Sequence, residues 1–153
     1  MSTRQYLSKI VATGLYTGYF PIAPGTVGSA LGLLIIFIFP GFQDLLLLIS
    51  SVLLFFIGVW AATEVEKTEG RDASIINVDE IVGMWVSIIF LPDGLQWYWL
   101  IIAFFVFRIF DILKPPPVNA SQKIPRGWGV MIDDILAGLY TNLLLRMVIY
   151  FLY

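Results

Sequence analysis

The sequence FRIFDILKPPPVNASQKIPRGWGVMIDD, residues 107–134, joins two strongly apolar segments through a polar loop. Three charged residues stand at the end of the first apolar segment: Arg108, Asp111 and Lys114. The triple proline Pro115–Pro117 stops any helix there, because proline lacks an amide hydrogen and clashes with the preceding turn. The pair Asp133–Asp134 marks the expected start of the second apolar segment. Ionisable groups beside such segments indicate either a functional site or ion pairs that close a helical bundle.

The overall composition predicts an integral membrane protein. The 153 residues are 59% hydrophobic and 13% charged, and the mean hydropathy is +0.87. Soluble domains carry about 25% charged residues. The length fits a single domain over residues 1–153. A net charge of −2 and the lack of a basic tail argue against a nucleic-acid partner.

The sequence contains neither cysteine nor histidine. This removes disulfides, thiolate nucleophiles, zinc–thiolate sites and imidazole ligands. It also removes histidine, the commonest general base. Chemistry in this chain therefore depends on carboxylates, hydroxyls, Lys, Arg, Tyr or a bound metal ion.

Hydrophobic periodicity predicts an all-α, polytopic membrane bundle. Residues 4–17 alternate as an amphipathic helix lying on the membrane surface, with Ser8, Lys9 and Thr13 on its wet face. Five apolar segments follow, at about 27–39, 45–62, 81–91, 97–113 and 135–153. A full span needs about 20 residues. The first and third segments are shorter, which leaves open whether they span and whether the true spans number three or four.

The distribution of Lys and Arg predicts the orientation. If every apolar segment crosses, the loops 63–80 and 114–134 share one side with most basic residues. The connections Pro40–Asp44 and Pro92–Gln96 fall on the other side and contain no Lys or Arg, and Arg146 alone departs from this pattern. The positive-inside rule makes the basic side cytoplasmic. The active site is then expected to face the cytoplasm.

A Pro- and Gly-rich stretch precedes the first apolar segment. Residues 18–29, GYFPIAPGTVGS, read as a loop that runs into a helix starting at about Thr26–Ser29. Free backbone N–H groups and the two hydroxyls suit an anion such as phosphate. An ordinary capped helix start is the alternative, and it is common. The spacing of Gly28 and Gly32 would let a second helix approach closely.

Two pairs of adjacent acids are expected to open helices. Asp79–Glu80 precedes the third apolar segment, and Asp133–Asp134 precedes the fifth. The helix dipole favours one acid at each start, but two acids beside an apolar run favour a further role. Asp111 with one acid of each pair would hold Mg²⁺, which prefers oxygen ligands. Arg108 and Lys114 would bind phosphate oxygens.

At these residues the sequence resembles the phosphatidylglycerophosphatase A family. Four stretches carry the resemblance, in the family's order and spacing: FPIAPGTVGS at 20–29, DASIINVDEIVG at 72–83, FRIFDILKPPPV at 107–118 and GWGVMIDDILAGL at 127–139. The resemblance implies a Mg²⁺-dependent enzyme of the bacterial inner membrane. Its expected activity is removal of the terminal phosphate of phosphatidylglycerophosphate, a phospholipid in the bilayer, to give phosphatidylglycerol. Ala73 stands where the family usually has proline.

The resemblance assigns most of the site to the charged residues named above. Catalytic roles are expected for four acids: Asp79, Glu80, Asp111 and Asp134. Metal binding is expected from the same four and Asp133. Phosphate binding is expected from Thr26, Ser29, Arg108 and Lys114. The resemblance also points to Asp72 as a site residue, without assigning it a role. Attack by a metal-activated water is favoured over a phospho-aspartyl intermediate. A small ion-coupled transporter and a non-catalytic membrane scaffold are the alternatives.

The predicted orientation has a direct test. Because the chain has no cysteine, single cysteines report sidedness cleanly. A Gln96→Cys variant should react with an impermeant thiol reagent only from the periplasmic side, whereas Lys123→Cys should react only from the cytoplasmic side. Labelling of Gln96→Cys from the cytoplasmic side alone contradicts the orientation.

Overall fold

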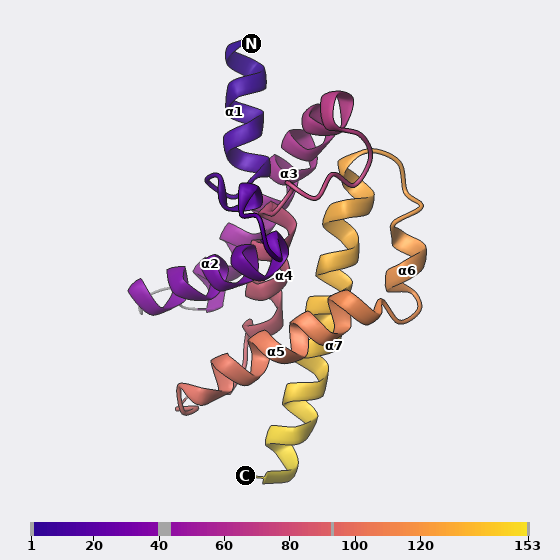
Figure 1. Cartoon of the computed structure of the whole chain (residues 1–153). Helices are drawn as coiled ribbons and strands as arrows, with labels where there is room; N and C mark the ends of the chain where they lie inside the picture. The colour runs from indigo at the N-terminus through magenta and orange to yellow at the C-terminus, as the bar shows by residue number, and fades with distance from the viewer. Residues whose placement is uncertain (1, 40–43, 93, 153) are drawn as a thin grey trace.

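The computed structural model of the chain describes residues 2–39, 44–92 and 94–152. Within these residues the protein is all-helical and contains no strand. The helices are α1 (Thr3–Ala12), the 3₁₀ turn η1 (Thr17–Tyr19), α2 (Pro24–Ile38), α3 (Asp44–Glu69), α4 (Val78–Ile88), α5 (Tyr98–Leu113), α6 (Val118–Ser121) and α7 (Gly127–Leu152). Figure 1 shows α4 and α7 side by side at the centre, with the other helices around them.

Two helices, α3 and α7, are long and apolar enough to cross a membrane. Each has 26 residues, and only 33% of its most apolar window is buried inside the protein. Their exposed surfaces carry large apolar side chains such as Leu53, Phe56 and Leu143. Such surfaces suit contact with lipid rather than water. The helix α2 is apolar but shorter, and α4 covers only eleven residues. A bundle of five spans stays a prediction. Two connections were predicted to lie together on the side without Lys or Arg, and their residues 40–43 and 93 lie outside the described residues.

The short helix α4 is the core of the fold. All eleven of its residues are buried, which is possible because glycines let its neighbours approach. A Cβ on Gly138 of α7 would lie 2.5 Å from the carbonyl oxygen of Gly83 in α4. A Cβ on Gly32 of α2 would lie 3.2 Å from Ile81 Cα. The close helix approach predicted from Gly28 and Gly32 is therefore confirmed, with α4 as the partner.

The N-terminal helix differs from its prediction in length and in polarity. It ends at Ala12 rather than near residue 17, because Gly14, Leu15 and Tyr16 all have positive φ. Its expected wet face is turned inward: Ser8 and Thr13 are buried, whereas Leu7 is half exposed. The helix packs against the end of α3. Ion pairs fasten it there, with Arg4 2.9 Å from Glu64 and Lys9 2.7 Å from Glu69.

Three predicted helix boundaries were wrong. The first apolar helix starts at Pro24 instead of Thr26–Ser29, since proline is well suited to a first turn. The loop predicted at 63–80 is shorter, because α3 continues to Glu69. The helix α7 begins at Gly127, so Asp133–Asp134 lie in its second turn and do not open it. Gly127 looked like a loop residue, yet it allows close packing, since a Cβ there would lie 2.5 Å from Val59 O.

The end of α4 explains Arg146, the basic residue that departs from the charge pattern. The last carbonyls of any helix lack partners within the helix. Here Asn142 Nδ2 donates to Ile89 O at 2.8 Å and to Ser87 O at 3.1 Å. Arg146 donates to Phe90 O and, at 2.7 Å, to Asn142 Oδ1. Two α7 side chains therefore satisfy the carbonyls at the end of a buried helix.

This arrangement predicts a large loss of stability on replacing Asn142. Asn142→Leu should lower the melting temperature in detergent, because each buried carbonyl left without a donor costs about 1–3 kcal/mol. Met147→Ala, on the exposed surface of the same helix, is the matched control and should change little. Equal melting temperatures for the two variants would show that the cap contributes nothing.

Candidate active site

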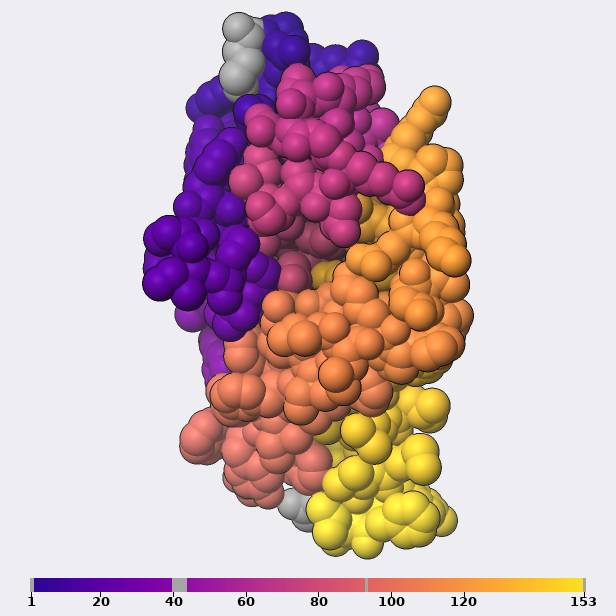
Figure 2. Space-filling view, turned by 45° about the vertical axis from the view of Figure 1, so that its right-hand side comes forward, coloured from indigo at the N-terminus to yellow at the C-terminus, as the bar shows by residue number. Residues whose placement is uncertain are grey.

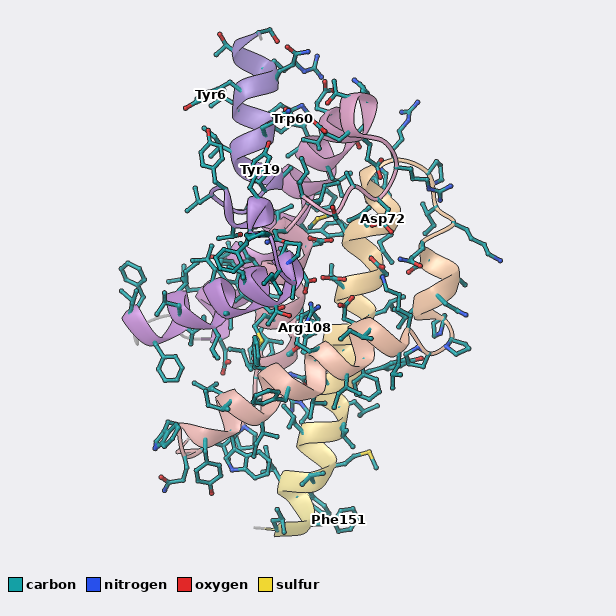
Figure 3. All side chains as sticks on the ribbon, viewed as in Figure 1. Tyr6, Tyr19, Trp60, Asp72, Arg108 and Phe151 are labelled. Carbon is teal, nitrogen blue, oxygen red and sulfur yellow. The ribbon has the colours of Figure 1, made fainter. Side chains whose placement is uncertain are left out.

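The predicted acids and bases meet in one polar cavity. The cavity has a volume of about 360 Å³ and lies between the start of α2, the loop 70–77, the first turn of α4, the end of α5 and the second turn of α7. Figure 2 shows a hollow between α2, the loop after α3 and the end of α5. In Figure 3, carboxylate oxygens gather between the labelled residues Asp72 and Arg108. Segments far apart in sequence therefore supply one site.

Three acids from three helices form the tightest cluster. Glu80 of α4, Asp111 of α5 and Asp134 of α7 each offer one carboxylate oxygen, and these oxygens lie within 4.8 Å of one another. All three side chains are buried, with exposures of 8%, 7% and 3%. Like charges held so close repel strongly in a protein interior, so a cation is needed among them.

Arg108 supplies part of that positive charge. Its Nη1 forms an ion pair with Glu80 Oε2 and lies 3.1 Å from Asp111 Oδ2. The same nitrogen lies 3.3 Å from Ser29 Oγ. Its Nε is buried without a hydrogen-bond partner among the described residues. Arg108 and Asp111 share a face of α5, as their spacing predicts, and that face is directed at the cavity.

Lys114 is the second cation of the cavity. The left-handed backbone of Lys114 ends α5 immediately before the prolines. Its Nζ lies 2.6 Å from Asp133 Oδ2 and 3.9 Å from Asp111 Oδ1. Burial favours the neutral amine, but the hydrogen bond to Asp133 and the neighbouring carboxylates outweigh it, so the pKa of Lys114 is raised. Lys114 therefore stays charged at neutral pH and bridges α5 to α7.

The start of α2 contacts the site through Glu80. Ser29 Oγ is 2.8 Å from Glu80 Oε2 and 2.9 Å from Gly25 O. A Cβ on Gly25 would lie only 2.1 Å from Glu80 Oε1. The hydroxyl of Ser29 contacts Glu80 and Arg108, and its predicted role in phosphate binding stays a prediction. Thr26, predicted for the same role, is half-buried and does not line the cavity.

Two site residues were missed in the sequence. Gly25 lines the cavity because only a residue without a side chain leaves room for Glu80. Asn77 donates to Pro24 O at 2.8 Å and to Thr17 Oγ1 at 3.1 Å, which fixes the start of α2 against α4. A Pro-Gly pair at a helix start and an asparagine two residues before an acidic pair were the available signals.

The remaining acids, Asp79, Asp133 and Asp72, add further negative charge to the cavity and its rim. Asp79 and Asp133 are buried and line the same cavity as Glu80 and Asp134, so both members of each pair face it. The oxygens Asp79 Oδ1, Asp133 Oδ1 and Asp134 Oδ2 are buried without hydrogen-bond partners in the described chain. Asp72 is exposed at the rim, where its backbone N–H donates to Glu66 Oε1 at 2.9 Å.

The arrangement fits a divalent cation. Five buried carboxylates line the cavity, against two cations, Arg108 and Lys114. Buried charge needs compensation, and the unpartnered carboxylate oxygens offer lone pairs for it. With oxygen ligands only and no histidine or cysteine in the chain, the donor set suits Mg²⁺, Mn²⁺ or Ca²⁺.

These features define a class of protein: a helical protein with two helices long and apolar enough to cross a membrane, and with a buried, carboxylate-rich cavity that also holds Arg and Lys. The sequence profile of the family "Phosphatidylglycerophosphatase A" matches residues 10–149. The chain belongs to the phosphatidylglycerophosphatase A family, and it is a phosphatase.

Individual relatives agree with the family over most of their length. A protein of Bacteroides thetaiotaomicron, provisionally named phosphatidylinositol-3-phosphatase, is 41% identical over 95% of this chain and 95% of its own. The phosphatidylglycerophosphatase A of Haemophilus influenzae is 36% identical over 86% of this chain and 82% of its own. The phosphatidylglycerophosphatase A of Escherichia coli is 34% identical over 84% of this chain and 76% of its own. The comparison with solved structures gave no match.

Gly25 provides a test of the site geometry. Gly25→Ala should lower phosphatase activity by at least about tenfold, because an added methyl group would displace the Glu80 carboxylate. The melting temperature should change little, since the start of α2 borders an open cavity. Gly94 has open space around it and does not line the cavity. Gly94→Ala is therefore the control for activity alone, which it should keep, although the positive φ of Gly94 makes the added methyl group lower the melting temperature. Full activity of Gly25→Ala would mean that Glu80 need not occupy its observed position.

Proposed function

We propose that the protein is a Mg²⁺-dependent lipid phosphatase that hydrolyses the terminal phosphate of phosphatidylglycerophosphate, giving phosphatidylglycerol and phosphate. The observation that carries the proposal is the cluster of Glu80, Asp111 and Asp134 within 4.8 Å, beside Arg108. The relatives from Haemophilus influenzae and Escherichia coli, which carry the name of this activity, support the choice of substrate.

The metal ligands in this proposal are Glu80, Asp111 and Asp134, with Asp79 and Asp133 close enough in the same cavity to adjust the charge. When bound, Mg²⁺ supplies positive charge that offsets a phosphate group and activates water. The three ligands come from α4, α5 and α7, so the site depends on the packing of these helices. Ser29 has a positioning role, since its hydroxyl orients both Glu80 and Arg108.

The two cations bind the substrate phosphate. Arg108 presents a planar guanidinium that can bind two phosphate oxygens at once, and its unpartnered Nε leaves a donor for that purpose. Lys114 lines the cavity and acts as a point charge. Both cations pair with carboxylates in the absence of substrate. A phosphate and a metal ion entering together would exchange these ion pairs for equivalent contacts.

Asp79 is the candidate general base. Its Oδ1 is buried, lines the cavity and has no hydrogen-bond partner among the described residues. A carboxylate in this position can take a proton from the water that attacks phosphorus. The leaving group is the primary alkoxide of the glycerol headgroup, which would take a proton from solvent water at the open cavity, while Asp79 later returns its proton to solvent.

The bacterial inner membrane is the proposed location, with the site on the cytoplasmic side. The spanning helices α3 and α7 would hold the cavity at the membrane boundary, where a lipid headgroup lies while its acyl chains stay in the bilayer. The end of α3, the loop after it and the approach to α7 carry Lys67, Arg71, Lys123 and Arg126. The positive-inside rule supports a cytoplasmic placement of that end.

A second candidate substrate is phosphatidylinositol 3-phosphate. It is favoured by the provisional name of the Bacteroides thetaiotaomicron relative, which has the higher identity to this chain. Both lipids carry a phosphomonoester on a glycerophospholipid headgroup, so the cluster and Arg108 would meet the same chemical group in each. They differ in the size of the alcohol that leaves.

A substrate panel separates these candidates. Phosphate release should be measured on phosphatidylglycerophosphate, phosphatidylinositol 3-phosphate, phosphatidic acid and glycerol 3-phosphate in matched detergent. We expect preferred turnover of phosphatidylglycerophosphate, complete loss on chelation, and recovery with Mg²⁺. Asp111→Asn, which removes a ligand charge at nearly constant shape, should lose most activity while it folds normally.

Three outcomes would contradict the proposal. Preferred turnover of phosphatidylinositol 3-phosphate would select the second substrate. Equal turnover of all four compounds would leave a phosphatase without lipid selectivity. Full activity in the presence of chelator, or in Asp111→Asn, would remove the metal from the mechanism.

A further inference from the structure

An apolar groove runs between α2 and α5. It has a volume of about 320 Å³. Its walls are Leu33, Leu34 and Phe37 of α2 and Ile101, Phe104 and Phe105 of α5. Three of these side chains are strongly exposed, with fractions of 51% for Leu34, 45% for Phe37 and 61% for Phe105. The groove is therefore open along one side.

The groove and the polar cavity are built by the same two helices. The cavity uses the beginning of α2 and the end of α5, whereas the groove uses the later part of α2 and the earlier part of α5. Figure 1 shows that both helices extend from the α4–α7 centre toward the same side of the molecule. The groove therefore leads away from the cavity toward the periphery.

The register on each helix aligns the groove with the cavity along α2 and α5. On α5, Phe104 precedes Arg108 by four residues and Ile101 precedes Phe104 by three, so the three lie on one stripe. On α2, Leu33 follows Ser29 by the same four residues. Each stripe is polar where it borders the cavity and apolar in the groove. A ligand that follows these stripes must be polar at one end and apolar along the rest.

A second apolar groove is not aligned with the polar cavity in this way. It lies between the end of α5 and α7 and is lined by Phe110, Tyr140, Leu143 and Met147, among others. Phe110 is two residues from Arg108, which places it about 200° away around the helix. The Phe110 and Tyr140 rings pack with centroids 5.6 Å apart, and Tyr140 donates to Pro116 O at 2.7 Å. These contacts separate this groove from the carboxylate cluster.

We propose that the α2–α5 groove binds an acyl chain of the lipid phosphate whose headgroup enters the cavity. This inference rests on the proposed function, because it requires a lipid substrate. A phosphomonoester beside Arg108 would place the glycerol between Ser29 and Phe104, and one chain would continue past Leu34 and Phe37. The open side of the groove would let the lipid enter laterally from the bilayer without leaving the membrane.

The test compares chain length in two groove variants. Leu34→Trp narrows the middle of the α2–α5 groove, and Leu143→Trp makes the same change in the other groove at a similarly exposed position. Phosphate release is measured on dioctanoyl and dipalmitoyl forms of the lipid that the unaltered protein accepts. For Leu34→Trp, the KM of the dipalmitoyl lipid should rise roughly tenfold, the effect of losing burial of about two methylene groups. Its kcat should not change, and the KM of the dioctanoyl lipid should rise much less, because a shorter chain contacts fewer of the groove residues.

Leu143→Trp should leave both KM values unchanged. An equal effect of the two variants, or an equal effect on the two chain lengths, would overturn the groove assignment. Absence of phosphate release from any lipid by the unaltered protein would instead overturn the proposed function, so the two failures are distinguishable.

Two further measurements test the proposal even if the bulky variant Leu34→Trp misfolds. Leu34→Ala removes contact without adding volume, so it should also raise the KM of the dipalmitoyl lipid, and an unchanged KM would overturn the proposal. A lipid phosphate with a photoreactive group at the end of its acyl chain should label α2 near Phe37 in the unaltered protein. Labelling confined to α7 would contradict the proposal independently of activity.

Discussion

The structure depends on holding several buried carboxylates around one cavity. Glu80, Asp111 and Asp134 place oxygens within 4.8 Å of one another, and Asp79 and Asp133 lie beside them. Electrostatic repulsion in a low-dielectric interior opposes such a cluster, so the fold must supply both compensation and rigidity. Compensation comes from Arg108 and Lys114, each paired with carboxylates from two helices. These ion pairs tie α4, α5 and α7 together at the same place where the chemistry is proposed.

Rigidity comes from α4, which carries Asp79 and Glu80 in its first turn. Glycines on α2 and α7 allow their backbones to approach it closely, and Asn142 and Arg146 satisfy the carbonyls at its far end. An eleven-residue helix can therefore lie wholly inside the protein with the carbonyls of its far end satisfied. The two long helices α3 and α7 provide the surface suited to lipid. The proposed activity follows from this division: a charged cavity for the phosphate and apolar surfaces for the rest of the lipid.

Much of the site could be predicted from the sequence because its residues are chemically conspicuous. Charged side chains beside apolar runs, such as Arg108 and Asp111, have few roles in a membrane protein. Helix starts were harder to predict, because Gly127 and Gly25 have the composition of loops but serve close packing. The polarity of α1 was wrong since Ser8 and Thr13 are buried by tertiary contact with no trace in the helical period. The role of Ser29 depends on a contact with Glu80, 51 residues away, which local spacing does not reveal.

The central claim is that the buried acids form a divalent cation site. Binding of Mn²⁺, a paramagnetic ion with the same oxygen preference as Mg²⁺, measures this directly by electron paramagnetic resonance on the purified protein in detergent. We expect saturable Mn²⁺ binding, and Mg²⁺ should displace the bound Mn²⁺. Asp111→Asn and Asp134→Asn should each weaken Mn²⁺ binding by at least about tenfold. Asp44→Asn, which is far from the cavity, should leave the Mn²⁺ affinity unchanged. Absence of saturable binding to the unaltered protein, or equal affinity in all three variants, would contradict the claim.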